Sequence, residues 1–420
     1  MNSGRPRPLY REKSFVFLWA AQTTSLAGSG ITAVVLPVLV YDRSGSAALT
    51  ALLTALEVLP YLAFGLVAGA MADRADRKRV MVGCDLVAAV LLGSIPAVQA
   101  GFGSLSVLQL LLVALGAATA FVWSDAASFG AVPALVGKAR IALAMSRIWS
   151  SEAVVGLLAP AAAGGLLALI SPANAIVVDS LSYLISAGLI ASIREPFQTS
   201  SPAERVTQWR TTLTRDIREG LAFLWGHRVL RSMTLASAAT AATGGAIEGL
   251  LVVYSVKALG FAKVDSRIGL LFSAAALGGL VASLLLPQIQ KRIGPGLTVV
   301  IFLFLNAVTL VVFALAPNLL VALPALATYD FAYAMITLGV VTFRQSATPD
   351  HLQSRVNATG RMLSWGGGQP LGAVVGGVLA SLLPIRVALL IMGVGVVTGL
   401  ILALQSPLIG ARRRIDPSPE

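Results

Sequence analysis

The sequence has few charged residues, one cysteine and two histidines. Charged residues make up 12% of its 420 residues, about half of the roughly 25% found in soluble domains, and so few charges cannot cover a surface that faces water. Apolar residues reach 56% and the mean hydropathy is +0.83, which predicts an integral membrane protein in place of two or three soluble domains. The single Cys84 excludes an internal disulfide framework and a cysteine-rich metal site, and His227 and His351 leave little for histidine-based chemistry.

Long apolar runs follow one another along the chain. The first of them has no small-residue cleavage site behind a short core, so we expect a membrane span and not a cleaved signal. The runs are too long and too continuously apolar for barrel strands, which predicts an all-α protein. Runs of about 20 residues occur twelve times, near 14–41, 47–71, 80–100, 104–130, 142–169, 173–193, 230–256, 264–289, 296–316, 318–343, 358–382 and 386–406.

The basic residues lie mainly on one side of these twelve spans. If both termini are cytoplasmic, 26 of the 31 lysines and arginines fall in cytoplasmic segments or span ends, a strong positive-inside signal. The net charge of +12 is therefore read as a topology signal, and we expect contact with membrane lipid and no nucleic-acid partner. The sequence predicts a multi-pass protein of a bacterial cell membrane, acting as a monomer, with both ends in the cytoplasm.

A polar stretch divides the twelve spans into six plus six. It carries Leu213, Ile217, Leu221 and Leu224 at a spacing that places them on one helix face, which is typical of an amphipathic helix lying at the surface. The predicted organisation is an N-terminal half, a cytoplasmic linker, a C-terminal half and a basic tail, at 1–193, 194–229, 230–406 and 407–420.

The two halves resemble each other at a constant offset. The segment Gly65–Gly69 is similar to Gly279–Ser283, 214 positions later, and Arg77-Lys78 falls on Lys291-Arg292 at the same offset. Matches of this kind at several separate places indicate a parallel internal repeat of two six-helix halves, an arrangement found in alternating-access transporters.

The short turn between the second and third spans carries a cluster of charges. It reads Gly69-Ala-Met-Ala-Asp73-Arg74-Ala-Asp76-Arg77-Lys78-Arg79 and resembles the G-x-x-x-D-R/K-x-G-R-R/K signature of the major facilitator superfamily. Asp76 stands where that signature usually has glycine, which resembles the branch containing macrolide-efflux proteins and the enterobactin exporter. The segments Leu18–Gln22, Ala131–Val136 and Asp179-Ser-Leu-Ser-Tyr183 also resemble that branch.

Two carboxylates among four bases can form a salt-bridge clamp that holds one conformation. The resemblance implies this role for Gly69, Asp73, Arg74, Asp76, Arg77 and Lys78, and we place Asp85, about one turn into the third span, beside them. An alternative is that the bases only anchor the turn on the cytoplasmic side. An enzyme that binds magnesium diphosphate through D-x-x-D would need a second acidic cluster, which the sequence lacks, so we expect no metal, no cofactor and no enzyme activity.

Rows of small residues run along four spans. Such rows let helix backbones approach closely, and the resemblance implies that spans 2, 5, 8 and 11 line the contact between the halves. The fifth span also resembles the antiporter pattern G-P-x-x-G-G in part, since alanines replace two of its glycines. Ordinary helix packing is the alternative for any single row. The residues assigned to this packing are Gly65, Pro160, Gly164, Gly279, Gly368, Gly372 and Gly376.

Seven acids lie inside predicted spans, and no base lies near the middle of any span. Inserting an acid near a helix centre costs about 2.5–3.5 kcal/mol, so such residues mark pathways or relays by default. Each must be protonated, solvated in a cavity or paired with a cationic substrate. We interpret Asp85 and Asp179 as structural, because the resemblance implies that spans 3 and 6 are supports. The candidates for proton coupling or substrate contact are Asp330, Glu248, Glu57, Glu152 and Asp125.

Polar and aromatic residues beside these acids suit a central cavity, which the resemblance places among spans 1, 4, 7 and 10. The expected lining is Trp19, Gln22, Thr119, Trp123, Thr240, Tyr329 and Tyr333. Acids with aromatic neighbours favour amphipathic organic cations. The leading hypothesis is therefore a drug:proton antiporter that exports neutral or cationic amphipathic molecules and uses the proton gradient as its energy source. A siderophore exporter and a metabolite importer remain alternatives, and a membrane enzyme or channel is a weaker one.

Overall fold

The structure is a computed structural model that describes residues 12–72, 75–137, 140–197, 209–349 and 352–405. Within these ranges it is built of helices and contains no strand, which confirms the all-α prediction. In this described part of the chain, eleven helices are long and apolar enough to cross a membrane, so the chain is a multi-pass membrane protein. The predicted run 358–382 forms three consecutive helical segments, of which the last has 14 residues, and it is not among those eleven.

The helices follow the predicted runs closely. Those of the first half and the linker are α1 Lys13–Ser44, α2 Ala47–Ala72, α3 Arg77–Phe102, α4 Val107–Val136, α5 Ile141–Leu169, α6 Pro172–Ser192 and α7 Trp209–Gly226. Those of the second half are α8 Arg228–Lys257, α9 Ile268–Ile293, α10 Pro295–Leu315, α11 Leu319–Ala347, α12 Gln353–Arg361, the π-helical segment η5 Met362–Gly368, α13 Gln369–Leu382, α14 Ile385–Met392 and α15 Val394–Leu404.

Local chemistry sets several helix ends. The carboxylate of Asp76 accepts a hydrogen bond of 3.2 Å from the backbone N–H of Arg79 and so caps the start of α3. At the other end of α3, Gly103 adopts a positive φ of 70°, a conformation that glycine reaches without steric cost. Ser171 caps α6 in the same way, just ahead of Pro172.

The chain forms two compact units. Unit 1 comprises residues 1–43, 59–207 and 264–269, and unit 2 comprises 44–58, 208–263 and 270–420. The first part of α2, up to residue 58, therefore groups with the second unit. The linker predicted at 194–229 lies partly outside the described residues, and the domain boundaries given above stay a prediction.

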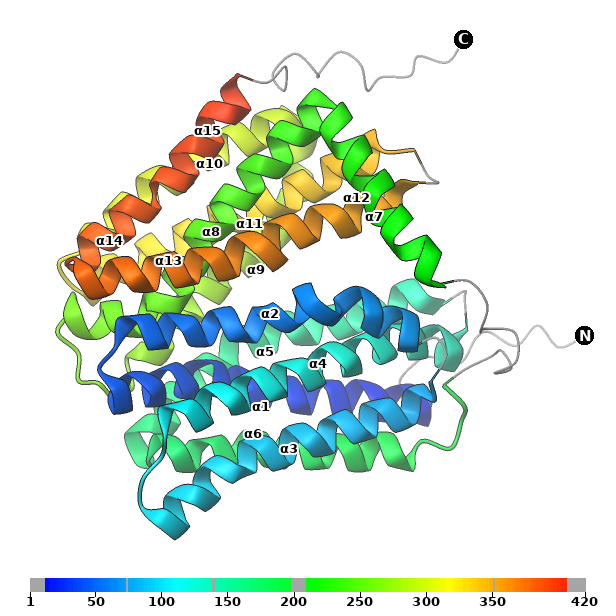
Figure 1. The fold of residues 1–420 in the computed structure, drawn as a ribbon, viewed down its shortest axis with the longest axis vertical. Coiled ribbons are helices and arrows are strands. Elements are labelled where there is room, and N and C mark those ends of the chain that lie inside the picture. The colour runs from blue at the N-terminus through cyan, green and yellow to red at the C-terminus, as the bar shows by residue number, and fades with distance from the viewer. Residues whose placement is uncertain (1–11, 73–74, 138–139, 198–208, 350–351, 406–420) are drawn as a thin grey trace, which may run out of the picture. The chain divides into compact units, whose positions relative to one another are not determined.

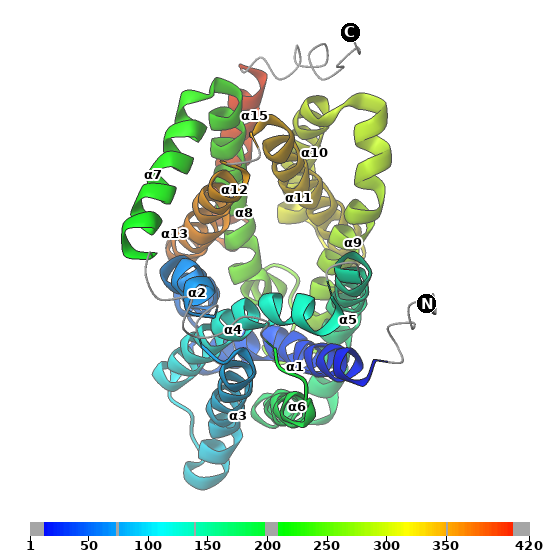
Figure 2. The same cartoon turned by 90° about the vertical axis from the view of Figure 1, so that its right-hand side faces the viewer.

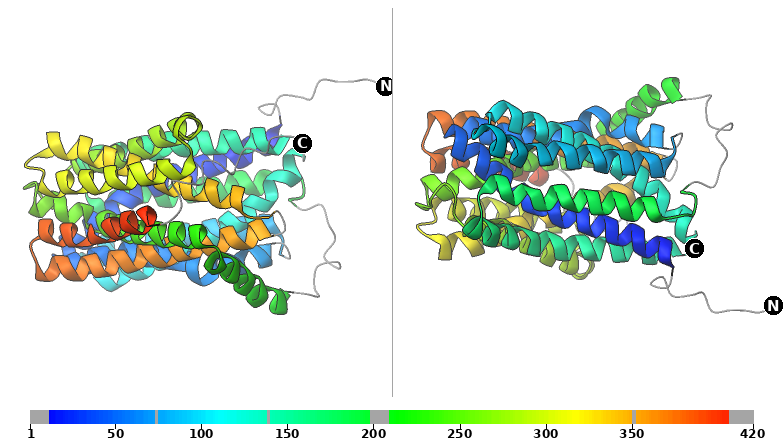
Figure 3. Two further views of the ribbon diagram at one scale, coloured as in Figure 1. Left: turned by 90° about the horizontal axis from the view of Figure 1, so that it is seen from above. Right: turned by 90° about the horizontal axis from the view of Figure 1, so that it is seen from below.

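Unit 1 is a bundle in which α3 packs between α4 and α6, and α5 contacts both α4 and α6. Figure 1 shows α1, α3, α4 and α6 running alongside one another, and Figure 3 shows the same alignment in two further views. Phe15 and Leu18 of α1, Met81 of α3 and Ile190 of α6 belong to one buried cluster. This apolar cluster holds together the helices that carry the polar groups described below.

Unit 2 is organised around α8, which packs against α13, α15, α11 and α7. Its other main contact joins α10 and α11, which lie next to each other in Figure 2. At the start of α14, the guanidinium of Arg386 donates to the backbone oxygens of Ala258 (3.3 Å) and Ala316 (2.9 Å). These oxygens follow the C-terminal ends of α8 and α10, where carbonyls attract a cation.

Candidate functional site

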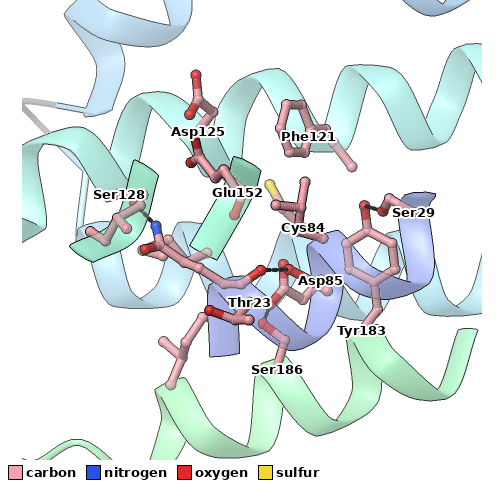
Figure 4. A pocket seen from close by; sticks show the side chains of 18 of the residues that line it. Thr23, Ser29, Cys84, Asp85, Phe121, Asp125, Ser128, Glu152, Tyr183 and Ser186 are labelled. Atoms are coloured by element: carbon pink, nitrogen blue, oxygen red, sulfur yellow. Dashed lines mark hydrogen bonds between the residues drawn. The ribbon is translucent and has the colours of Figure 1, made fainter. Parts of the chain in front are cut away.

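A pocket lies inside unit 1, lined by α1, α3, α4, α5 and α6. Figure 4 shows its side chains from close by. Most of its polar lining is hydroxyl, amide or carboxyl oxygen, and none of the lining residues in the described part of the chain is lysine, arginine or histidine. The pocket can therefore accept hydrogen bonds and hold positive charge, and its lining offers no cationic side chain to neutralise an anion.

Three acids line this pocket. Asp125 of α4 and Glu152 of α5 are both solvent-accessible and interact electrostatically with each other, and Figure 4 shows their carboxyl groups side by side. Asp85 of α3 is only 3% exposed and accepts a hydrogen bond of 2.6 Å from Ser186 of α6. The structure therefore moves Asp85 from the predicted charge cluster to the pocket, where a hydroxyl is its partner.

The predicted cavity residues of the first half have different surroundings. Gln22 lines the pocket and donates from Nε2 to the hydroxyl of Ser128. Trp19 is not among the lining residues, and its indole N–H donates to Ser151 at 2.8 Å, which joins α1 to α5. Thr119 bonds to a carbonyl of its own helix at 2.7 Å. Thr119 and Trp123 are likewise absent from the lining in the described part of the chain, so Gln22 is the predicted residue that the pocket contains.

A second group of acids lies in unit 2. Glu248 of α8 is solvent-accessible, and its Oε2 accepts a hydrogen bond of 2.7 Å from Gln369 of α13. Glu57 of α2 and Asp330 of α11 each interact electrostatically with Glu248. The three acids that the sequence singled out in this part of the chain are therefore neighbours, although they come from three helices.

The aromatic residues of α11 are placed beside this acid group. The ring of Tyr333 lies 3.1 Å from where a Cβ would stand on Gly244, one turn before Glu248, and it stacks on Tyr329 with centroids 6.5 Å apart. Tyr329 is only 1% exposed, and so is Thr240, whose hydroxyl bonds to its own helix. Tyr333 thus fits the predicted lining, whereas Tyr329 and Thr240 support the packing behind it.

The bases of the predicted clamp bond to backbone oxygens of unit 1. Arg77 donates to the carbonyls of Gly130 (2.6 Å) and Phe197 (3.2 Å). Lys78 donates at 2.8 and 2.6 Å to two carbonyls at the end of α6, where the helix dipole favours a cation. Asp76 forms an exposed ion pair with Arg79 at 3.3 Å. Asp73 and Arg74 lie outside the described residues, and so do the side-chain surroundings of Gly69.

The glycine row of the eleventh predicted span packs inside unit 2. A Cβ on Gly368 would lie 2.5 Å from the oxygen of Ala238, one on Gly372 would overlap the oxygen of Ala242, and one on Gly376 would lie 2.7 Å from a methyl of α8. These contacts join α13 and η5 to α8, so a role of the glycines between the halves stays a prediction.

The other small residues are placed as follows. Pro160 and Gly164 of α5 pack against residues Ser266 and Gly269 of the same unit, and a Cβ on Gly65 or Gly279 would meet no atom of the described chain within 4 Å. Their assigned role between the halves also stays a prediction.

Sequence reasoning missed the hydroxyl groups that dominate the pocket. Ser29 and Ser124 come from helices already identified as cavity helices, while Tyr183 and Ser186 come from α6. A usable signal was the run of serines in spans that are otherwise apolar, because a hydroxyl in a span is best satisfied toward other protein groups. The resemblance at Asp179–Tyr183 concerns sequence alone and does not predict this chemistry.

Comparison with known proteins gives consistent matches over the whole chain. A family model described as transmembrane secretion effector matches residues 6–418. The multidrug efflux pump Tap of Mycobacterium tuberculosis is 26% identical over 426 residues, covering 98% of this chain and 96% of the relative. Macrolide efflux protein A of Streptococcus pyogenes is 25% identical over 410 residues, covering 96% and 97%. The enterobactin exporter EntS of Citrobacter koseri is 25% identical over 418 residues, covering 97% and 94%.

Solved structures show the same fold at low sequence identity. The nucleoside transporter NupG superposes with a TM-score of 0.77 at 14% identity, covering 94% of this chain and 99% of that structure. A bacterial homologue of the iron transporter ferroportin, in an inward-facing state, superposes with a TM-score of 0.71 at 16% identity, covering 95% and 99%.

Proposed function

Because the chain belongs to the transmembrane secretion effector family of the major facilitator superfamily, and is therefore a membrane transporter and not an enzyme, we propose that it is a proton-coupled exporter of amphipathic neutral or cationic small molecules. The observation that carries this proposal is the chemistry of its two acid groups. The pocket of unit 1 and the Glu248 group of unit 2 present carboxyl, hydroxyl and amide oxygens, with neutral partners such as Ser186 and Gln369.

Charge balance gives the coupling. A carboxylate held among apolar helices is costly unless a positive charge neutralises it, and a proton and an organic cation can each do so. When a cation binds to the acid group, the proton is released. When a proton returns, it neutralises the carboxylate, so binding of the cation is weakened and the cation leaves. Competition for one negative charge therefore links outward movement of cargo to inward movement of protons.

Aromatic groups beside the acids add affinity for organic cations. Phe121 lines the pocket next to Asp125 and is 40% exposed. In unit 2, Tyr333 lies on the helix that carries Asp330, against the helix of Glu248. An aromatic face near a cation contributes about 0.5–2 kcal/mol, in addition to its apolar contact with the rest of the molecule. Efflux of drugs by two of the relatives named above supports the same class of cargo.

Export of an anionic siderophore is the alternative that the enterobactin exporter suggests. A polyanion would need arginine or lysine in the binding region, whereas the pocket of the described chain is lined by acids and neutral groups. This chemistry favours cations, and inclusion of an anionic cargo in the same assay keeps the alternative testable.

The test uses the full chain reconstituted in liposomes, with a labelled lipophilic organic cation as cargo and a pH dye inside. A pH gradient should drive cation movement against an opposite flow of protons, and a protonophore should abolish it. Glu248→Gln and Asp330→Asn should each lower this movement by at least about tenfold, a coupling effect of ordinary size. Glu195→Gln, which alters an acid outside the spans, is the matched control and should transport like the unaltered chain.

Two results would reject the proposal. Cation movement that does not respond to the pH gradient would remove proton coupling. Gradient-driven movement of an anionic cargo, without movement of the cation, would show that the substrate is an anion.

A further inference from the structure

Unit 1 contains a buried acid that lies outside both acid groups described above. Asp179 of α6 is 1% exposed and does not line the pocket in the described part of the chain. The backbone of α1 passes directly over it, because a Cβ on Gly28 would lie 2.5 Å from Asp179 Oδ1 and would overlap the hydroxyl of Ser182. No layer of water can fit between α1 and this carboxyl group.

The partners of Asp179 are neutral hydroxyl groups. Ser182 donates to Oδ1 at 3.2 Å and Ser29 of α1 donates to the same oxygen at 3.4 Å. The titratable groups on the elements around it are Asp85 and Cys84 of α3, Glu152 of α5, Tyr61 of α2 and, on α6 itself, Tyr183. All of these are acidic or neutral, so none can offset a negative charge on Asp179. A buried carboxylate without a positive partner is strongly disfavoured, and the neutral, proton-carrying form is the one that this site accommodates.

A chain of hydrogen bonds leads from this acid to the pocket. The hydroxyl of Ser29 also shares a hydrogen bond of 3.0 Å with the phenol of Tyr183, which lies one helical turn after Asp179. Both Ser29 and Tyr183 line the pocket, and Figure 4 shows the bond between them. Ser29 is therefore the link between a buried acid and a space that is lined with polar groups and lies beside two accessible carboxylates.

We propose that Asp179 is a proton-carrying group of the transport cycle, which exchanges its proton with the pocket through Ser29 and Tyr183. In the proton-carrying state the carboxyl O–H donates to the Ser29 oxygen, Ser29 donates to Tyr183, and Tyr183 donates to water in the pocket. On release, the carboxyl proton passes to the Ser29 oxygen while Ser29 passes its own proton to the Tyr183 oxygen, and Tyr183 gives its proton to that water, which leaves Ser29 donating to the charged carboxylate. Each hydroxyl ends with one proton, and the net change is the transfer of one proton from Asp179 to the pocket. This inference rests on the proton coupling proposed above.

The position of Gly28 gives the proton a structural effect. When Asp179 loses its proton, a negative charge remains against the backbone of α1 with no base to offset it. That charge favours separation of α1 from α6, because separation would let water reach the carboxylate. Protonation restores the close contact at Gly28. A purely structural role would not need this chemistry, since an asparagine amide could also form hydrogen bonds with Ser29 and Ser182.

The test separates proton movement from cargo binding in the reconstituted full chain. Exchange of labelled for unlabelled cation at equal pH on both sides needs no net proton transfer, whereas accumulation driven by a pH gradient does. Asp179→Asn should keep exchange within about twofold and lose gradient-driven accumulation by at least about tenfold. Ser29→Ala should slow gradient-driven proton movement, as should Tyr183→Phe. Ser182→Ala removes a hydroxyl from the same carboxyl group without touching the link to the pocket, and should slow proton movement less than Ser29→Ala does.

The outcomes distinguish the two proposals. If Asp179→Asn accumulates cation as the unaltered chain does, the role of Asp179 is overturned and the proposed function stands. If the unaltered chain exchanges cation but shows no gradient-driven accumulation, both are overturned. Should Asp179→Asn not fold, the matched pair decides, because equal proton movement in Ser29→Ala and Ser182→Ala would reject the relay. Infrared detection of a protonated carboxyl band that Asp179→Asn removes is the independent supporting measurement.

Discussion

Replacement of Gly372 by alanine should push α13 away from α8 and weaken the contact that orients Glu248. A Cβ at this position would overlap the backbone oxygen of Ala242. One turn before it on the same helical stretch, Gln369 donates its 2.7 Å hydrogen bond to Glu248. On α8, Gly245 in turn faces the backbone oxygen of Gln369 without room for a Cβ. The acid group of unit 2 therefore depends on backbone contact between two helices.

The size of the effect follows from this geometry. A carbon and a carbonyl oxygen in ordinary contact are about 3.3–3.6 Å apart, so the helices must separate by on the order of 1 Å to admit the methyl group. Such overpacking typically costs about 1–3 kcal/mol. A displacement of the same size would stretch the bond between Gln369 and Glu248 beyond the roughly 3.2 Å limit of a good N–H···O hydrogen bond.

The assay is thermal unfolding of the purified chain in detergent, together with cation transport in liposomes. Gly367→Ala is the matched control, because a Cβ there meets a single backbone oxygen, that of Met362, at an ordinary 3.6 Å. We expect Gly372→Ala to unfold at a lower temperature and to transport less, and Gly367→Ala to resemble the unaltered chain. Equal behaviour of the two variants would refute the argument from packing.

Two further predictions concern helix ends of unit 1, at Lys78 and at Glu195. Lys78→Ala should destabilise the chain by about 1–2 kcal/mol, because it removes two charge-assisted hydrogen bonds at the end of α6. Arg79→Ala removes only an exposed ion pair and should have almost no effect in the same thermal assay. The Ser14 hydroxyl and then the backbone N–H of Glu195 lower the pKa of the exposed Glu195 below its ordinary 4.5. A lowered pKa stabilises the folded chain at pH values above 4.5 and ceases to do so as the pH falls through the lowered pKa. Ser14→Ala should therefore reduce stability slightly at neutral pH, and its difference from the unaltered chain should vanish in acid. A stability difference that grows in acid would contradict this sign.

The spans could be predicted from sequence because the lipid leaves the backbone no other choice. Every peptide group must be bonded within its own helix, and runs such as 14–41 and 230–256 therefore became α1 and α8 within a few residues. Capping residues supplied some of the ends, as Asp76 does for α3. The acids could be found by the same logic, since charge is rare where lipid surrounds the chain.

The surroundings of those acids could not be predicted, because they depend on how each helix is rotated about its axis. The sequence places Asp85 beside the charged turn, but its side chain accepts a hydrogen bond from Ser186, about a hundred residues away. The sequence predicts that Thr240 and Glu248 both face the central cavity, yet Thr240 is buried and bonds to its own helix while Glu248 is accessible. Spacing along a helix defines which residues share a face, and only packing decides what that face meets.

The π-helical segment η5 has a consequence for mutagenesis along the stretch that leads into α13. Its wider turns, in which the N–H of Gln369 bonds to the oxygen of Ser364, hold one residue more than an α-helical path would. Each residue of an α-helix turns the chain by about 100°, so the extra residue rotates α13 relative to α12 by about that angle. In a scan of successive cysteines, accessibility will repeat with the helical period in α12 and again in α13. Between the two helices, at η5, the repeat will shift by one residue. Labelling patterns interpreted with a single helical period from α12 onwards would therefore assign positions of α13 to the wrong face.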